Sequence, residues 1–241
     1  MINFTESKMN QFTYKDWIVW FAHNDRERLT IDFSEEKELS DKEIRLYFPS
    51  IREFQKGEGS DGAYLLKAAG RFADQIKAGE YREAMEWFVK EENYHSAYLR
   101  KFMDYYQIDV KKSSFLDHVF RKLRQIGGIK CEVTVLVTAE MIALTYYDAL
   151  AKSTDSPALK SICEQMLKDE IPHIMFQSHT LSLFKNSKKD NILRVLLMEG
   201  TLLFVWGAFH RVYLSGGYGF GRFLKENLGY LRQSVYLTGS R

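Results

Sequence analysis

Proline is scarce in this chain, which has only three prolines in 241 residues, and runs that alternate apolar and polar residues are nearly absent. Proline interrupts helices, and such alternation is typical of half-buried strands. The two scarcities together favour long helices and exclude a β-rich fold. With 45% hydrophobic residues, the chain is long enough and apolar enough to bury a large core. We therefore predict an all-α protein.

Cysteine is scarcer still. The two cysteines, Cys131 and Cys163, form no CxxC pair, which excludes a disulfide framework and a cysteine-rich zinc site. The N-terminal stretch MINFTESKMNQF lacks the apolar core of a signal peptide. We expect a cytoplasmic protein.

The chain also lacks an excess of either charge, since 34 Lys and Arg residues face 32 Asp and Glu residues. The basic residues form no stripe, so we expect no nucleic-acid partner. The most membrane-like run, VLLMEGTLLFVWGAF at 195–209, is short for a bilayer span and contains Glu199. We expect a buried helix at this run and no membrane partner.

Capping signals and apolar periodicity locate the helices. Ser40 and Glu43 have the spacing of a capping box, so a helix should begin there. Pro49 is expected to kink or restart it, after which one apolar stripe continues to Ile76. Ser156 followed by Pro157 is another start signal. Further helices are predicted at 81–106, 131–152, from 157 past 179, and at 191–214.

These helices suggest three segments. Residues 1–40 should wrap around the core, 41–185 should form a four-helix bundle, and 186–241 should be a C-terminal helical extension packed on that bundle.

Each of the four predicted bundle helices carries an acidic residue in its apolar stripe, where a charge is costly. The second and fourth helices also carry a histidine three residues later, in the pattern Glu-x-x-His. In chain order the candidate residues are Glu58, Glu92, His95, Glu140, Glu170 and His173.

The intervals between these residues fit helical hairpins. Glu140 and Glu170 each lie 15 residues from Asp155 in the turn STDSP, which would bring their side chains level. The first hairpin is less symmetrical, because Gly79 in its turn lies 21 residues after Glu58 but 13 before Glu92. Either the first helix is bent around KGEGSDG, or Asp61 takes the place of Glu58.

Four carboxylates gathered in an apolar core repel one another and lose hydration, and two divalent cations would cancel their charge. Carboxylate and imidazole ligands without thiolate suit iron(II) or manganese(II). In a Glu-x-x-His pair both side chains lie on one helix face, so the glutamate can bridge two metals while the histidine binds one. We therefore predict two iron ions, with manganese as the alternative.

The order E, ExxH, E, ExxH resembles the ligand set of the ferritin-like di-iron carboxylate superfamily, and KGEGSDG followed by EENYH is similar to motifs of its rubrerythrin-like members. The likeness covers roughly 51–180. It implies that Glu92 and Glu170 bridge the metals, that Glu58 and Glu140 bind terminally, and that the two histidines bind one metal each. Pro172 departs from the pattern, because it should distort the helix that carries Glu170.

Two acidic residues stand next to candidate ligands. Glu91 is expected to be a solvated surface charge. Asp169 is expected to be either a surface charge or a residue that orients a ligand histidine. The remaining histidines lack a partner at ligand spacing and are assigned structural roles. Trp206 and His210 are expected to form a lid over the bundle.

Three classes of function remain open: an oxidoreductase that activates dioxygen or peroxide on a small-molecule substrate, an iron-storage protein, and a bundle with a structural metal. The segments outside the bundle favour a pocket over a storage shell, so we expect an enzyme that is a monomer or small homo-oligomer. No catalytic residue can be named. Because no rubredoxin-type CxxC pairs occur, the electrons should come from an external donor.

Overall fold

The computed structural model describes residues 1–59, 62–112, 121–122 and 127–239. Every regular element among them is a helix, which confirms the prediction of an all-α protein.

The chain folds into two compact units. We name them after their central helices, α4 (Gly79–Tyr105) and α7 (Pro157–Ser182). The α4 unit comprises 11–32 and 48–132, and the α7 unit comprises 1–10, 33–47 and 133–241. Each unit therefore combines N-terminal and later parts of the chain. The division into three consecutive segments stays a prediction.

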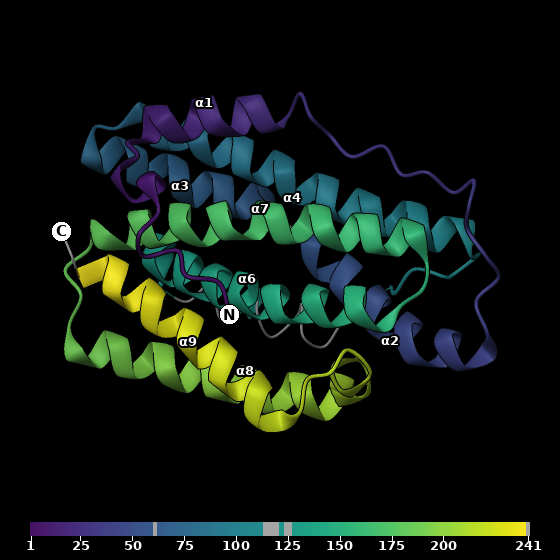
Figure 1. The fold of residues 1–241 in the computed structure, drawn as a ribbon. Helices are drawn as coiled ribbons and strands as arrows, with labels where there is room; N and C mark the ends of the chain where they lie inside the picture. The colour runs from purple at the N-terminus through teal and green to yellow at the C-terminus, as the bar shows by residue number, and fades with distance from the viewer. Residues whose placement is uncertain (60–61, 113–120, 123–126, 240–241) are drawn as a thin grey trace. The chain divides into compact units, whose positions relative to one another are not determined.

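The α4 unit is organised around one long helix, α4 (Gly79–Tyr105). Helices α1 (Tyr14–Asn24) and α3 (Gly62–Ile76) pack against it, as Figure 1 shows. Thr13 caps α1 through a capping box with Asp16. The buried face of α4 includes Met85, Phe88 and Phe102, spaced as expected for one side of a helix.

The first predicted bundle helix is two helices. Helix α2 runs from Asp41 to Glu58 and α3 starts at Gly62. The helical backbone is therefore broken within KGEGSDG. This is one of the two alternatives that the sequence left open.

Ser40 caps α2 as predicted, because the Glu43 carboxylate accepts from the Ser40 backbone N–H at 2.9 Å and the Ser40 hydroxyl accepts from the Glu43 N–H at 3.4 Å. Pro49 lies inside α2 without ending it.

The α7 unit contains the C-terminal helices. Its main elements are α7, α8 (Lys188–Ser215), α9 (Phe220–Gly239) and, from residue 133 on, α6 (Gly128–Ser153). Helix α9 packs on both α7 and α8. The Ser156 hydroxyl accepts from the Leu159 N–H at 3.0 Å, which confirms the predicted start of α7.

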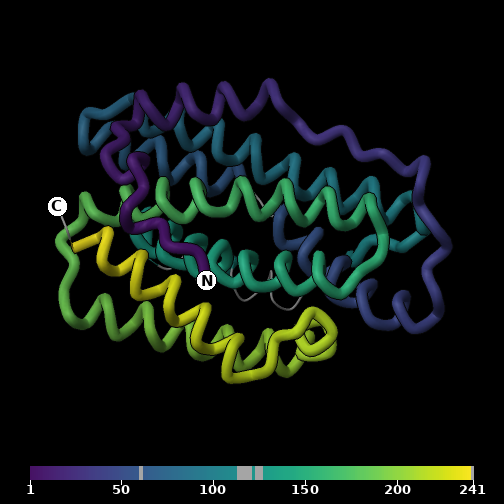
Figure 2. The backbone as a smooth tube through the Cα atoms, viewed as in Figure 1, coloured from purple at the N-terminus to yellow at the C-terminus, as the bar shows by residue number. Residues whose placement is uncertain are grey.

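The first ten residues run along the α7 unit and lead into a short 3-10 helix, η1 (Lys8–Gln11), as Figure 2 shows. The Phe4 N–H donates to the Gln233 side chain on α9 at 2.8 Å, and the Ile2 N–H donates to the Tyr230 hydroxyl at 3.3 Å. The N-terminus is therefore fastened to the last helix.

The expectation of a buried helix at 195–209 is wrong. Two helices, α6 and α8, are long and apolar enough to cross a membrane by length and composition, but they differ in burial. The most apolar 18-residue window of α6 is 78% buried, whereas that of α8 is 22% buried. Trp206 packs against Phe220 and Phe223 at ring-centroid distances of 5.1 and 5.3 Å, and its role as a lid stays a prediction.

Glu91 also corrects the sequence analysis, because it is fully buried rather than solvated. Its Oε1 accepts from the Arg28 guanidinium at 2.8 Å and from the Asn24 side-chain amide. Arg28 in turn lies 4.1 Å from the centre of the Tyr94 ring. This network fixes the end of α1 against α4, one residue from the candidate ligand Glu92.

Gly216 ends α8 at a point of close approach. A Cβ at this position would lie 2.6 Å from the Cα of Ala149 on α6 and would also overlap its carbonyl oxygen. The backbone conformation of Gly216, φ −83° and ψ 11°, is open to other residues, so space alone requires glycine here.

We predict that Gly216→Ala lowers the free energy of unfolding by roughly 1–3 kcal/mol, because the added methyl group meets backbone that cannot move aside. Denaturant titration followed by circular dichroism would measure the change. Gly219→Ala is the matched control, since a Cβ at Gly219 meets nothing within 4 Å. Equal stability of the two variants would contradict the prediction.

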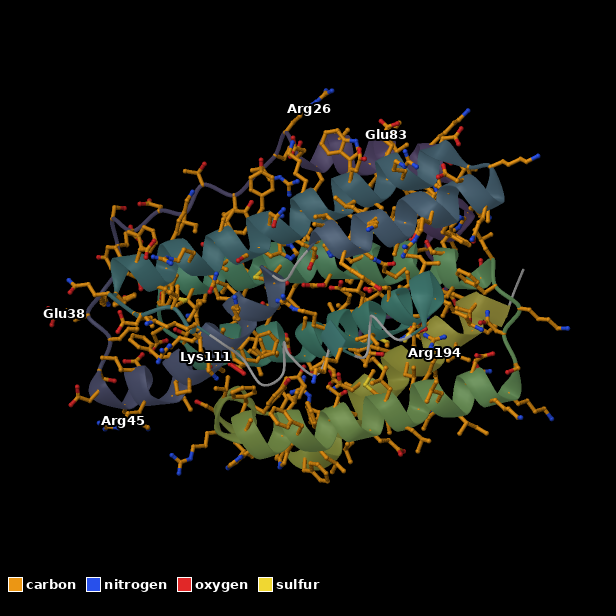
Figure 3. All side chains as sticks on the ribbon, turned by 180° about the vertical axis from the view of Figure 1, so that it is seen from behind. Arg26, Glu38, Arg45, Glu83, Lys111 and Arg194 are labelled. Atoms are coloured by element: carbon orange, nitrogen blue, oxygen red, sulfur yellow. The ribbon has the colours of Figure 1, made fainter. Side chains whose placement is uncertain are left out.

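We also predict that Arg28→Met lowers the free energy of unfolding by about 3–5 kcal/mol, because it leaves the Glu91 charge buried without its cation. Arg26→Met is the control. Arg26 is exposed and points outward in Figure 3, so its loss should change stability by less than about 0.5 kcal/mol. A thermal or denaturant melt of both variants is the measurement. A stable Arg28→Met protein would mean that Glu91 is neutral or reaches solvent.

Candidate metal centre

In the α4 unit, three predicted ligands lie together. Glu58 is the last residue of α2, and Glu92 and His95 lie on one face of α4. The Nδ1 atom of His95 is 3.6 Å from an oxygen of Glu92 and 4.0 Å from an oxygen of Glu58. His95 is fully buried, and the two carboxylates expose 16% and 10% of their side chains. The interruption after α2 thus does not remove Glu58 from the cluster.

The α7 unit contains a second cluster of the same composition. Glu140 comes from α6, while Glu170 and His173 come from α7. The Nδ1 atom of His173 is 3.7 Å from an oxygen of Glu170 and 3.8 Å from an oxygen of Glu140. All three residues are buried, and one ligand atom from each lies within 4.8 Å of the others. This cluster can hold a metal ion.

The chemistry of both clusters fits a first-row transition metal. Histidine-to-carboxylate distances of 3.6–4.0 Å are longer than hydrogen bonds. They are also shorter than the roughly 4.2 Å that separates two ligands on opposite sides of an ion bound at about 2.1 Å, so one ion fits between each pair. Burial raises the pKa of the Cys163 thiol, so the cysteine on α7 stays protonated and offers no thiolate. Each cluster supplies two carboxylates and one imidazole.

Two features of the sequence departed from the expected ligand pattern: the offset of Glu58, with Asp61 as its alternative, and Pro172 inside the second Glu-x-x-His motif. Asp61, the alternative to Glu58, lies outside the described residues. Pro172 lies inside α7, which continues without interruption to Ser182, and Glu170 and His173 still share a face. The proline therefore leaves the Glu-x-x-His geometry intact.

The residue before each Glu-x-x-His glutamate is a buried acid. Glu91 is held by Arg28 and Asn24, and Asp169 accepts two hydrogen bonds from the Gln165 side chain, at 2.9 and 3.0 Å. The surface assignment of Asp169 is therefore wrong, and its role in orienting a histidine stays a prediction. In the sequence, the buried acid before each motif is visible as an acidic pair, Glu91–Glu92 in one motif and Asp169–Glu170 in the other.

None of the other histidines belongs to these clusters in the part of the chain that the structure describes. His23 is exposed and lies 3.9 Å from Glu27, and His210 contacts the backbone of Trp206. His118 lies outside the described residues.

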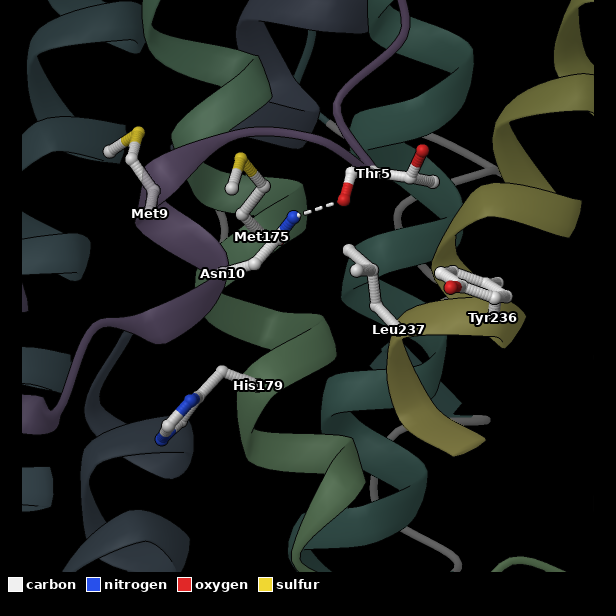
Figure 4. Close-up of a pocket in the computed structure, with 7 residues that line it drawn as sticks. All are labelled: Thr5, Met9, Asn10, Met175, His179, Tyr236 and Leu237. Carbon is white, nitrogen blue, oxygen red and sulfur yellow. Dashed lines mark hydrogen bonds between the residues drawn. The ribbon is translucent and has the colours of Figure 1, made fainter. Parts of the chain in front are cut away.

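His179 lines a pocket of about 220 Å³ between the N-terminal segment, α7 and α9, shown in Figure 4. Met175 and Tyr236 line it as well. Met175 and His179 follow His173 by two and six residues, which turns them toward the opposite side of α7. The pocket is therefore separate from the face of that helix that carries Glu170 and His173.

No family model and no curated protein matches this chain. A solved structure of an R2-like ligand-binding oxidase from Sulfolobus acidocaldarius is similar, with a TM-score of 0.66. The match covers 98% of this chain and 94% of that chain at 16% sequence identity. At this identity the likeness establishes the fold. The chain thus has the ferritin-like fold that its two Glu-x-x-His motifs first indicated.

Proposed function

We propose that the protein is a di-metal oxidoreductase in which the two clusters together bind two iron ions. The observation that carries this proposal is the match between the clusters. Each has a lone glutamate and a Glu-x-x-His pair, and the histidine Nδ1 lies 3.6–4.0 Å from both carboxylates in each case. Two unrelated buried histidines would have no reason to share this arrangement.

Six residues would hold the metals. By the resemblance, Glu92 and Glu170 would bridge and Glu58 and Glu140 would bind terminally, while His95 and His173 would bind through the Nδ1 atoms that face the carboxylates. The ions would supply the electrons that reduce dioxygen or peroxide. The four carboxylates would balance the charge of two divalent cations, and both histidines are fully buried.

The substrate would be a small organic molecule. The similar solved structure is of an oxidase that binds a ligand, and this supports a comparable role for a ligand here. An external protein would deliver electrons, because the chain has no second redox motif. We propose a soluble, cytoplasmic enzyme with dioxygen or peroxide as the oxidant. Manganese is the alternative metal.

Iron storage is the second candidate, because the same ligands serve proteins that mineralise iron. Storage needs a closed shell of many subunits, whereas an oxidoreductase needs only its two metals and a substrate pocket. The long α8 and α9 helices that follow the last ligand favour the enzyme.

We predict about two iron ions per chain after reconstitution with iron(II). Glu92→Ala and Glu170→Ala should each weaken metal binding by at least about tenfold, since even the loss of a group that only supports a ligand costs roughly 10–100-fold. Metal analysis of the dialysed proteins is the measurement.

The matched controls for these variants are Glu86→Ala on α4 and Glu164→Ala on α7, which change exposed glutamates of the same helices. Both should keep the wild-type metal content. Glu58→Ala should lose metal, whereas Asp61→Ala should not. Wild-type protein that binds no metal would contradict the proposal. If Asp61→Ala lost metal and Glu58→Ala kept it, the ligand would be Asp61.

We further predict that iron uptake in air stops near two ions per chain, and that the reduced protein reacts with dioxygen or peroxide in a single turnover. Stopped-flow absorption and iron titration test the two halves. Loading of many irons per chain would favour storage. A metal pair that stays inert to both oxidants would favour a structural role.

A further inference from the structure

Gln177 is a buried amide on the same helix as Glu170 and His173. Its side chain has no exposed surface. In the part of the chain that the structure describes, neither the amide oxygen nor the amide nitrogen of Gln177 has a hydrogen-bond partner. Buried polar groups in folded proteins are nearly always hydrogen-bonded, and leaving one unpaired destabilises the protein. This amide therefore needs a partner that the described chain does not supply.

The position of Gln177 on α7 links it to the second cluster. It follows Glu170 by seven residues and His173 by four, and residues at these spacings lie on one face of a helix. A helix rises by about 1.5 Å per residue, so Gln177 lies roughly 6 Å along the axis beyond His173 and roughly 10 Å beyond Glu170. A molecule that extends from the cluster along this face of α7 would reach the amide.

The neighbours of Gln177 on α7 offer it no hydrogen bond. Ile174 and Leu181, three residues before it and four residues after it, are buried and apolar. The Thr180 hydroxyl donates to the backbone carbonyl of Phe176 at 3.2 Å, so its proton is already used. The amide is thus a single polar group within an apolar stretch of this face.

Helix α6 continues the apolar surroundings. Helices α6 and α7 are joined by only three residues, 154–156, and therefore run antiparallel. Val133 lies 20 residues before the end of α6, and Gln177 lies 20 residues after the start of α7, so the two come level. Val133 and Val137 are both buried and share the face of Glu140. Aliphatic side chains of this kind suit the hydrocarbon part of a bound molecule.

We propose that Gln177 binds a neutral polar group of the organic substrate and thereby selects substrates that carry one. The proposal rests on the proposed function, because it assigns the residue to the substrate of that site. An amide side chain has donors and an acceptor but no charge. It matches a group that both donates and accepts, and it cannot neutralise a buried anion. The substrate class is an apolar molecule with a hydroxyl or a primary carboxamide roughly 6–10 Å from its reacting end.

A buried water is the alternative partner. Such a water makes about three hydrogen bonds to polar groups around it. The side chains that flank Gln177 on α7 and α6 are aliphatic, except for Thr180, whose hydroxyl is bonded to its own helix. These surroundings favour an organic molecule, whose apolar part can contact them, over water.

Melting of the ligand-free protein tests whether the amide is unpaired. Methionine has the length and flexibility of glutamine without its amide. Gln177→Met should therefore raise the melting midpoint by at least about 2 °C, because it removes an unpaired buried polar group. The proteins are compared after dialysis and at equal metal content. Native mass spectrometry checks that no organic molecule remains bound.

Gln165→Met on the same helix is the matched control. The Gln165 amide donates to both carboxylate oxygens of the buried Asp169, at 3.0 and 2.9 Å. Its replacement should lower the melting midpoint, so the same substitution should have opposite signs at the two positions. An unchanged or lower midpoint for Gln177→Met would mean that water or another group already pairs with the amide, and would overturn the proposal.

Binding of model compounds to the iron-reconstituted protein tests the substrate class. Hexanamide and hexanol each carry a group that donates and accepts, whereas chlorohexane, of similar length, has no hydrogen-bond donor. Isothermal titration calorimetry without air should show that hexanamide, hexanol or both bind the wild type. They should bind Gln177→Met at least about fivefold more weakly, and chlorohexane should show no such loss. The compound that binds more tightly identifies the polar group.

Metal content separates this proposal from the proposed function. Gln177 is not a predicted ligand, so Gln177→Met should keep the iron content of the wild type. Wild-type protein without iron would contradict the proposed function, while the melting comparison would still report whether the amide is unpaired. If the iron-loaded wild type bound neither hexanamide nor hexanol, or bound them no better than Gln177→Met does, the role of Gln177 would be overturned.

Discussion

Burial of acidic side chains within packed helices is the constraint on which this structure depends. Glu91, Glu140, Asp169 and Glu170 are all at most 4% exposed. A carboxylate in such surroundings must be neutralised by a proton, a cationic side chain, a set of hydrogen-bond donors or a metal. The protein uses more than one of these solutions, and the choice at each position separates structural acids from candidate ligands.

Neighbouring residues on α4 show this division. Glu91 forms an ion pair with Arg28, so its negative charge is neutralised by a side chain of the protein itself. Glu92, rotated by about 100° around the helix, faces His95 and Glu58. A histidine shared by two carboxylates offsets at most one of their charges. The composition of the cluster thus calls for a cation, whereas that of the Glu91 network does not.

The sequence predicted what depends on local chemistry. Ser40 and Ser156 mark helix starts through caps that involve residues only three positions away, and Glu-x-x-His fixes a shared face within one turn. It did not predict the burial of Glu91, because the compensating Arg28 lies 63 residues earlier in the chain. The predicted burial of α8 was also wrong, because an apolar helix has the same sequence pattern whether or not another element covers it. The sequence predicted an irregularity near Glu58, where the structure has a break, only as one of two alternatives, the other being Asp61 as the ligand.

That break has an electrostatic consequence. The peptide dipoles of a helix place about half a negative charge at its C-terminus. Glu58 is the last residue of α2, whereas Glu140 lies in the middle of α6. Lys56, the basic residue of the last turn of α2, is two positions earlier and so projects from another side of the helix. The dipole of α2 therefore adds a negative partial charge beside Glu58 that has no counterpart beside Glu140. It thus makes the surroundings of the two lone glutamates electrostatically unequal.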